Sequence, residues 1–263
     1  MLKLIDLYKQ ADVNQISGFA TTAKNLDITG ICEGYAALRS TAPQRFKRGK
    51  RYFIDSHNGI PNSGESSNRR EEHLAIAMYN ASRSEKRFEL PDSRHLKIMD
   101  YQMPLKAKQS DVGIGKVDLF GVLDKTLPTV IELKIEGQNG SYSDTPLRAL
   151  LEGLAYCAIV EANMSAITEE ALSEFGLSLL ATRPILIVMA PEAYWRRYLE
   201  NPSTGSWLPE LLRIIEGLKV QLKLEIHMVA LKGTELEMGL GGKRPVLHGN
   251  CKFVSVEKFA GVF

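Results

Sequence analysis

Three charged side chains stand in an otherwise apolar stretch of this chain, and their types and spacing could hold a metal ion. Asp118 lies in the run GKVDLFGVL, and Glu132 and Lys134 lie in the run TVIELK that follows a short turn. Side chains alternate between the two faces of a strand, so Glu132 and Lys134 share a face, while the apolar residues between and beside them face the other way. Two carboxylates beside an ammonium group could bind a divalent ion that activates water for phosphodiester hydrolysis.

The two runs predict a β-hairpin that turns near Asp124, Lys125 and Thr126. If the strands pair antiparallel about residue 125, Asp118 lies opposite Glu132, with opposed Cβ atoms roughly 5 Å apart. Like charges directly opposite destabilise a strand pair, so we expect a cation between them. Oxygen ligands without nearby histidine or cysteine suit Mg²⁺ or Mn²⁺ rather than zinc. The alternative is a solvent-exposed Glu-x-Lys face with an aspartate nearby by chance.

The length and composition favour one large α/β domain, or one domain with an appendage. The chain has 263 residues, 44% of them hydrophobic, and a net charge of only +2. No apolar run approaches the ~20 residues of a membrane span, and residues 1–11 are charged and amphipathic rather than a signal peptide. Cys32, Cys157 and Cys251 are odd in number and far apart, which argues against disulfides and a zinc site. We therefore expect a cytoplasmic protein without membrane contact.

Basic side chains gather between Glu33 and Asp55, a stretch that contains no acid. Aromatic side chains lie among and beside them. Cations interleaved with aromatic rings are typical of contacts to a phosphate backbone, whereas a solvated connector would have the same composition. The predicted nucleic-acid-binding residues in this stretch are Arg45, Lys47, Arg48, Lys50 and Arg51.

Around the hairpin, the pattern predicts a helix, three strands, a helix and a strand. Thr145 can cap the second of these helices, with Pro146 at its first position. A sheet with helices on both faces is the natural packing of such a series. The helices are expected over 69–82 and 147–162 and the strands over 96–104, 115–123, 128–136 and 184–190. Helices over 3–11, 29–40, 192–200 and 207–218 and strands over 223–231 and 252–256 are also expected.

A stretch rich in glycine, serine and asparagine, residues 57–68, divides the chain into two parts. Residues 1–67 form a helical and basic N-terminal segment that could contact nucleic acid. Residues 68–263 form the domain that contains the hairpin.

The order of the central elements, with Asp118, Glu132 and Lys134 on the second and third strands, resembles the PD-(D/E)xK nuclease superfamily. This superfamily includes many restriction endonucleases and the RecB-type and lambda-exonuclease-type DNA nucleases. The likeness covers roughly residues 68–231, and Val117 replaces the proline that gives the motif its name. It implies a restriction-endonuclease-like αβββαβ core with a mixed central sheet.

The resemblance also implies roles for the two flanking helices. Members often carry a glutamate on the helix before the first strand, where this chain has Glu71 and Glu72, and helical phasing favours Glu71. Either could complete the metal site or hold a second ion, or could simply complement the helix dipole. RecB-type members carry a Gln-xxx-Tyr pair on the later helix, where Glu152 and Tyr156 stand here, with Arg148 one turn earlier. An internal Arg148–Glu152 ion pair would explain the same residues.

The resemblance implies Mg²⁺- or Mn²⁺-dependent hydrolysis of DNA, which leaves a 5′-phosphate and a 3′-hydroxyl, in restriction, repair or phage defence. Asp118, Glu132 and the carbonyl of Leu133 would bind the metal, and Lys134 would orient or deprotonate the attacking water and stabilise negative charge. Many relatives cut as homodimers. Two alternatives stay open, namely a nuclease-fold module that binds DNA without cutting it and a structural protein whose hairpin charges pair among themselves.

Overall fold

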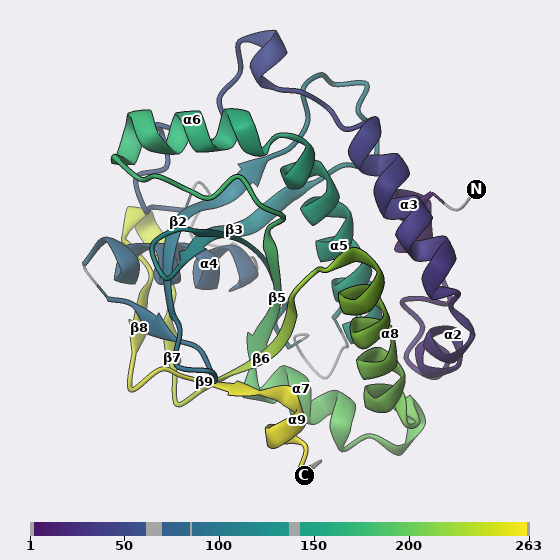
Figure 1. Cartoon of the computed structure of the whole chain (residues 1–263). Helices are drawn as coiled ribbons and strands as arrows, with labels where there is room; N and C mark the ends of the chain where they lie inside the picture. Colours follow the sequence, from purple (N-terminus) through teal and green to yellow (C-terminus); the bar gives the residue numbers. More distant parts are fainter. Residues whose placement is uncertain (1–2, 62–69, 85, 137–142, 262–263) are drawn as a thin grey trace.

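The computed structural model describes residues 3–61, 70–84, 86–136 and 143–261. Within these ranges a mixed, seven-stranded sheet forms the centre, and helices flank it (Figure 1). Its strands lie in the order β1-β2-β3-β4-β5-β6-β9. The expected α/β class, with a mixed central sheet and flanking helices, is therefore confirmed. The proposed boundary between residues 67 and 68 lies outside the described residues.

The elements begin and end within a few residues of the expected positions, and α2, α6, α9, β1, β7 and β8 were not expected. The α-helices are α1 Leu4–Leu7, α2 Phe19–Asn25, α3 Ile28–Ser40, α4 Arg70–Arg83, α5 Pro146–Ala162, α6 Met164–Phe175, α7 Glu192–Leu199, α8 Trp207–Leu222 and α9 Val256–Phe259. The strands of the central sheet are β1 Phe88–Glu89, β2 His95–Pro104, β3 Lys116–Leu123, β4 Leu127–Leu133, β5 Ile185–Pro191, β6 Ile226–Lys232 and β9 Lys252–Ser255. A separate ribbon pairs β7 Glu235–Glu237 with β8 Val246–His248.

The hairpin of β3 and β4 has the register that the sequence predicted. Leu119 pairs with Ile131, and Leu123 pairs with Leu127, which centres the turn on residue 125. Asp124 and Lys125 have φ angles of 47° and 71°, the left-handed conformations that suit a tight hairpin turn. One step beyond the first pair, the register brings Asp118 and Glu132 to opposite positions on one face of the ribbon.

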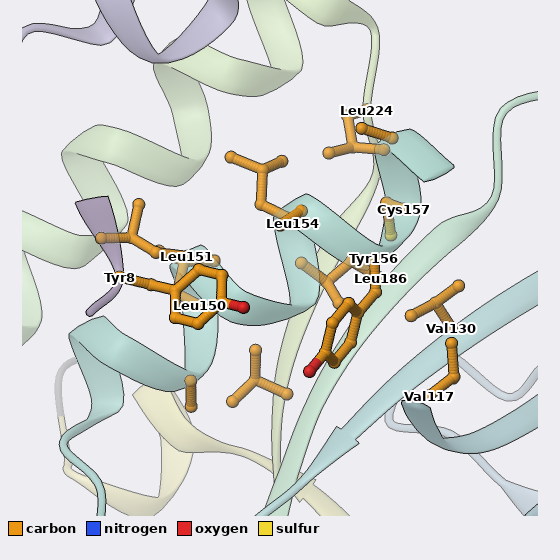
Figure 2. Close-up of a cluster of buried hydrophobic side chains, with 14 of the residues drawn as sticks. Tyr8, Val117, Val130, Leu150, Leu151, Leu154, Tyr156, Cys157, Leu186 and Leu224 are labelled. Atoms are coloured by element: carbon orange, nitrogen blue, oxygen red, sulfur yellow. The ribbon is translucent and has the colours of Figure 1, made fainter. Parts of the chain in front are cut away.

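Helix α5 covers this face of the sheet and begins as expected, with Thr145 accepting a hydrogen bond from the backbone N–H of Arg148 and Pro146 at the first position. Figure 2 shows Leu154 and Tyr156 of α5 among buried apolar side chains that include Val130 of β4. A Cβ atom added at Gly153 would lie 3.2 Å from Glu132 Cβ, so the glycine lets α5 lie close over β4. No single helix in the described ranges is long and apolar enough to span a membrane. Helices α5 and α6 have the necessary length and apolarity only when they are taken together, and a bend of 77° separates them.

The N-terminal helices pack against the same face as α5. Leu4, Tyr8, Phe19, Ile31 and Tyr35 are all buried in the hydrophobic cluster that includes the apolar side of α5. Helix α4 lies on the opposite face, over a second cluster of buried side chains from β2, β3 and β4. The sheet is therefore filled on both sides, and the N-terminal segment supplies part of one core.

Candidate active site

The three charged side chains of the hairpin converge where β4 ends. Asp118, Glu132 and Lys134 are buried, with exposed fractions of 8%, 2% and 5%. The Nζ atom of Lys134 lies 2.5 Å from Glu132 Oε1 and 3.8 Å from carboxylate oxygens of both Asp144 and Glu152. One ammonium group therefore faces three carboxylates in a site from which water is largely excluded.

Asp118 is held by two hydrogen bonds that fix both of its oxygens. The backbone N–H of Leu133 donates to Oδ2 at 3.0 Å, and the side-chain amide of Gln102 donates to Oδ1 at 3.0 Å. Gln102 lies within β2 but has a φ angle of 49°, which is uncommon for a residue other than glycine. Backbone strain of this kind is often found at functional sites. Sequence reasoning did not identify Gln102, because a glutamine in a strand carries no signal of this role.

One carboxylate oxygen of Glu132 lacks a hydrogen-bond partner among the described residues. Oε1 accepts from Lys134, whereas Oε2 is buried and unpaired. Leaving a buried carboxylate oxygen without a partner is unfavourable by about 1–3 kcal/mol or more. The unpaired oxygen, the neighbouring carboxylate of Asp118 and the absence of soft ligands from this set fit a hard divalent cation such as Mg²⁺.

Helix α4 adds Glu71 to the same place. Burial raises the pKa of Glu71 to about 7, and nearby carboxylates such as Asp118 add to the rise, while Lys134 opposes it. The charge of Glu72, the next residue on the helix, acts instead on Tyr101. Glu71 is therefore coupled electrostatically to the charges of the hairpin, while Glu72 acts on Tyr101 and His73. Below, the acidic cluster means Glu71, Asp118, Glu132, Lys134 and Glu152.

The acidic cluster contains more carboxylates than one ammonium group can balance. Burial raises the pKa of Asp118, and raises that of Glu132 well above its usual range, although Lys134 opposes both shifts. Burial alone would lower the pKa of Lys134, but Glu132 and the surrounding carboxylates overcome this effect and raise it well above its usual range. A divalent cation bound there would favour the ionised carboxylates and oppose these shifts.

The polar residues of α5 form the wall of the site that faces Lys134. The hydroxyl of Tyr156 donates to Glu152 Oε1 at 2.8 Å. Arg148 Nη1 lies 3.2 Å from Asp144 Oδ1, while its Nε lies 4.0 Å from Glu152 Oε2. The internal Arg148–Glu152 ion pair considered from the sequence is thus at the limit of contact, and Glu152 interacts more closely with Tyr156.

Residues of the N-terminal segment complete this wall, which the sequence did not indicate. Asn14 Nδ2 donates to Asp144 Oδ1 at 2.9 Å, and Asn14 Oδ1 accepts from the backbone N–H of Thr145 at 2.8 Å. Burial raises the pKa of the Tyr8 hydroxyl, and the negative charge of Glu152 raises it further. Asn14 therefore links the start of α5 to a carboxylate that faces Lys134.

The five predicted nucleic-acid-binding residues divide into two kinds. Arg45 is buried and donates to backbone carbonyls, and Lys50 Nζ donates to another carbonyl at 2.6 Å. Arg51 forms ion pairs with three carboxylates. Lys47 and Arg48 are exposed. The structure thus leaves Lys47 and Arg48 most available for a phosphate backbone, while the other three support the local fold.

A second group of potential metal ligands lies at the other end of the strands. Ligand atoms of Asp92, Glu225 and His227 all lie within 4.8 Å of one another. The guanidinium of Arg94 sits among them, 2.6 Å from Asp92 and 3.0 Å from His227, and also pairs with Glu225. A cation of the protein itself therefore already occupies this position, near the amino ends of β2 and β6.

A cavity of about 640 Å³ is lined by residues that neighbour the acidic cluster in the sequence. Its lining includes Arg70, the residue before Glu71, and Ile135 and Glu136, which follow Lys134. Arg70 is paired with Glu136 at 3.1 Å. The cavity lies at the carboxyl ends of the parallel strands, where ligands of α/β sheets commonly bind, and no residue of the acidic cluster is among those that line it.

Comparisons of this chain with protein-family models, with curated proteins and with solved structures find no match.

Proposed function

We propose that this protein is a divalent-metal-dependent nuclease that hydrolyses DNA phosphodiester bonds. The observation that carries the proposal is that Asp118, Glu132 and Lys134 are buried close together. Among the described residues, Glu132 Oε2 has no hydrogen-bond partner. An excess of buried carboxylates over cations is costly unless further positive charge binds there.

The order of the elements supports a restriction-endonuclease-like core. Helix α4 is followed by the antiparallel strands β2, β3 and β4, then by α5, and β5 lies parallel to β4. The acidic cluster lies on these same elements. Apart from the two-residue strand β1 and the helix α6, this order agrees with the αβββαβ series that the likeness to PD-(D/E)xK nucleases implies.

The residues of the cluster fit distinct tasks in the proposed reaction. Asp118 and Glu132 would hold Mg²⁺ or Mn²⁺, with the Leu133 carbonyl and Glu71 as further oxygen ligands, and the bound ion would supply Lewis-acid activation of phosphate and water. Lys134 remains an ammonium group because carboxylates surround it, so it would orient the water and donate to the phosphate oxygens as negative charge develops.

The proposed reaction consumes one water molecule. A bond forms between the water oxygen and phosphorus, and the bond from phosphorus to the 3′ oxygen breaks. The leaving 3′ oxygen takes up a proton, so that the products are a 5′-phosphate and a 3′-hydroxyl. Gln102 and the backbone N–H of Leu133 keep Asp118 in one orientation during this change.

The test is incubation of the protein with plasmid and single-stranded DNA in Mg²⁺, Mn²⁺ or EDTA. We expect cutting with metal only, and a loss of more than about 100-fold in Asp118→Asn, which removes one ligand charge. The matched control is Asp124→Asn, the same chemical change in the turn of the same hairpin, where φ is already 47°. Retarded but uncut DNA would instead identify a binding module, and full activity of Asp118→Asn would reject the site.

A further inference from the structure

A second cavity, of about 440 Å³, lies along the edge of β2. Strand β1 pairs only with the first two residues of β2, so the rest of this edge has no strand beside it in that direction. The segment 51–57 and the end of α4 border the edge instead, and the last residues of α6 line the same cavity. This cavity shares no lining residue with the cavity of about 640 Å³ at the carboxyl ends of the parallel strands.

His57 lines the cavity and is held in one orientation by a buried carboxylate. Its Nδ1 lies 2.6 Å from Asp100 Oδ1, and Asp100 is only 3% exposed. Asp100 also accepts from the backbone N–H groups of Ile54 and Tyr101, so its oxygens act as acceptors. The ring of His57 stacks on Tyr101 with centroids 4.2 Å apart and an interplanar angle of 18°.

These contacts indicate which ring nitrogen of His57 carries the hydrogen. Because an ionised carboxylate can only accept, the hydrogen of His57 lies on Nδ1. Its Nε2 has no hydrogen-bond partner in the part of the chain that the structure describes, and the ring borders the cavity. A fixed imidazole with one open nitrogen is a group that can share a hydrogen with a ligand.

The acidic side chains that line this cavity have ion-pair partners, whereas two of its basic side chains have no carboxylate partner among the described residues. The three acids that line it, Asp55, Asp100 and Glu174, are each paired with a positive or imidazole group of the protein. Lys97 and Arg83 also line it, and neither has a carboxylate partner among residues 3–61, 70–84, 86–136 and 143–261. Arg83 lies over the ring of Tyr79, with its guanidinium carbon 5.7 Å from the ring centroid, a contact that leaves its charge unbalanced. Cations without a described carboxylate partner, beside an open imidazole nitrogen, favour an anion with several oxygens.

The cavity also presents an aromatic surface. Phe175, the last residue of α6, lines the cavity with an exposed fraction of 42%, which is high for a phenylalanine. Its ring packs edge-to-face on Phe53, with centroids 5.0 Å apart. An exposed ring at a cavity wall is a stacking surface for a nucleobase, and a cavity of about 440 Å³ lies within the usual size of small-ligand sites.

We propose that this cavity binds a nucleotide through a terminal phosphate. His57 Nε2, Lys97 and Arg83 contact the phosphate oxygens, and Phe175 stacks on the base. A phosphomonoester carries about 1.5 to 2 negative charges near neutral pH and three strong acceptor oxygens, which suits cationic donors. Binding needs neither a metal nor the acidic cluster, so the site is independent of the proposed cleavage.

The same chemistry can come from a free mononucleotide or from the phosphorylated end of a nucleic-acid strand. Calorimetric titration in EDTA, which prevents metal-dependent cutting, compares four probes. They are AMP, adenosine, a 5′-phosphorylated single-stranded hexanucleotide and the same hexanucleotide with a 5′-hydroxyl. The probes form two pairs, AMP with adenosine and the 5′-phosphorylated hexanucleotide with its 5′-hydroxyl form. Where a pair binds, we expect its phosphorylated member to bind at least about 10-fold more tightly, because it can form charge-assisted hydrogen bonds. Preference for the phosphorylated strand over AMP identifies the strand end, and similar affinity identifies the phosphate of any nucleotide.

Variants locate the binding in this cavity. Lys97→Gln, Arg83→Gln and His57→Gln should each weaken AMP binding by about 5- to 10-fold, with folding checked by thermal denaturation. Lys232→Gln, at an exposed lysine on the end of β6, is the matched control. Asp118→Asn should bind AMP like the unchanged protein, which separates this site from the proposed nuclease centre. The proposal would be overturned if neither pair showed a preference for its phosphorylated member. It would also be overturned if Lys97→Gln and Arg83→Gln both bound the preferred phosphorylated probe as tightly as the unchanged protein does.

Discussion

Lys134 is the residue on which the charge balance of the acidic cluster depends. Its ammonium group lies 2.5 Å from Glu132 and within 3.8 Å of Asp144 and Glu152. Removing one partner of a buried ion pair leaves the other charge uncompensated, which typically costs about 3–5 kcal/mol. In the proposed mechanism, Lys134 balances the carboxylates before a metal binds and stabilises the phosphate afterwards.

The variant Lys134→Met should therefore lose both stability and cleavage. In EDTA its free energy of unfolding should fall by about 3 kcal/mol. Mg²⁺ should restore more stability to this variant than to the unchanged protein, because the ion supplies the missing positive charge. Thermal denaturation with and without Mg²⁺ measures both effects, and Lys125→Met in the exposed hairpin turn is the control. A variant that melts like the unchanged protein in EDTA would show that the ion pair contributes nothing.

Glu71 makes the stability of the metal-free protein depend on pH. Burial, assisted by nearby carboxylates, raises its pKa from 4.5 to about 7 in the folded protein. The folded state thus holds this proton more tightly than the unfolded chain, so the contribution is present below pH 4.5 and is lost as pH rises through about 7. In EDTA, stability should fall between these values by on the order of 2 kcal/mol.

Chemical denaturation of the protein and of Glu71→Gln across this pH range tests the prediction. The variant should show a flatter dependence on pH, because the neutral amide cannot ionise. Glu72→Gln is the adjacent control, since Glu71 acts on Lys134 and Glu72 acts on Tyr101. Equal slopes for Glu71→Gln and the unchanged protein would remove Glu71 from the cluster.

Among the elements, the start of α5 matters most for the geometry of the site. Asp144, just before the helix, and Glu152, within it, both lie near Lys134, and Thr145 caps the helix. Asn14, in the segment between α1 and α2, bonds both to Asp144 and to the backbone of Thr145. A residue remote in sequence thus positions the wall of the proposed active site.

The variant Asn14→Ala should cost about 1–2 kcal/mol of stability, because it removes two hydrogen bonds. It should also lower the cleavage rate at saturating Mg²⁺ and DNA by roughly 10-fold. The Mg²⁺ concentration for half-maximal activity should change little, because Asn14 acts through Asp144 rather than on the metal ligands. Gln10→Ala, at an exposed position in the same segment, is the control. If stability falls while the rate at saturation is unchanged, Asn14 has only a structural role.

At the scale of the whole molecule, the N-terminal segment and the rest of the chain share one core. Leu4, Tyr8, Phe19, Ile31 and Tyr35 are buried against the α5 side of the sheet. Each large apolar side chain of this kind contributes about 1.5–3 kcal/mol by burial. Their sum is therefore comparable to the usual net stability of a domain, about 5–15 kcal/mol.

A chain that lacks residues 1–67 should fail to form a stable, soluble fold, because the apolar side of α5 would be exposed. Size-exclusion chromatography and circular dichroism of residues 68–263 would measure this, with the full chain alongside. A cooperative thermal transition of the shortened chain near that of the full chain would show instead that residues 68–263 fold alone.

The local features of the hairpin could be predicted from the sequence alone. Alternation placed Glu132 and Lys134 on one face, and the turn near Asp124 set the register that brings Asp118 opposite Glu132. The start of α5 followed from Thr145 and Pro146 in the same way. These features depend on residues close together in the chain, whose geometry follows from strand periodicity and capping.

Only the tertiary structure decided which side chains meet around that hairpin. Gln102 lies on a strand that the sequence predicted, but nothing in the strand pattern indicated its role, and Asn14 comes from a segment that the sequence did not connect to the site. Arg45, Lys50 and Arg51 form hydrogen bonds or ion pairs within the protein. Sequence reasoning predicted the hairpin because its contacts are short in range and follow from backbone geometry. It could not predict the rest because those partners depend on how distant elements pack, which the pattern of any single element does not contain.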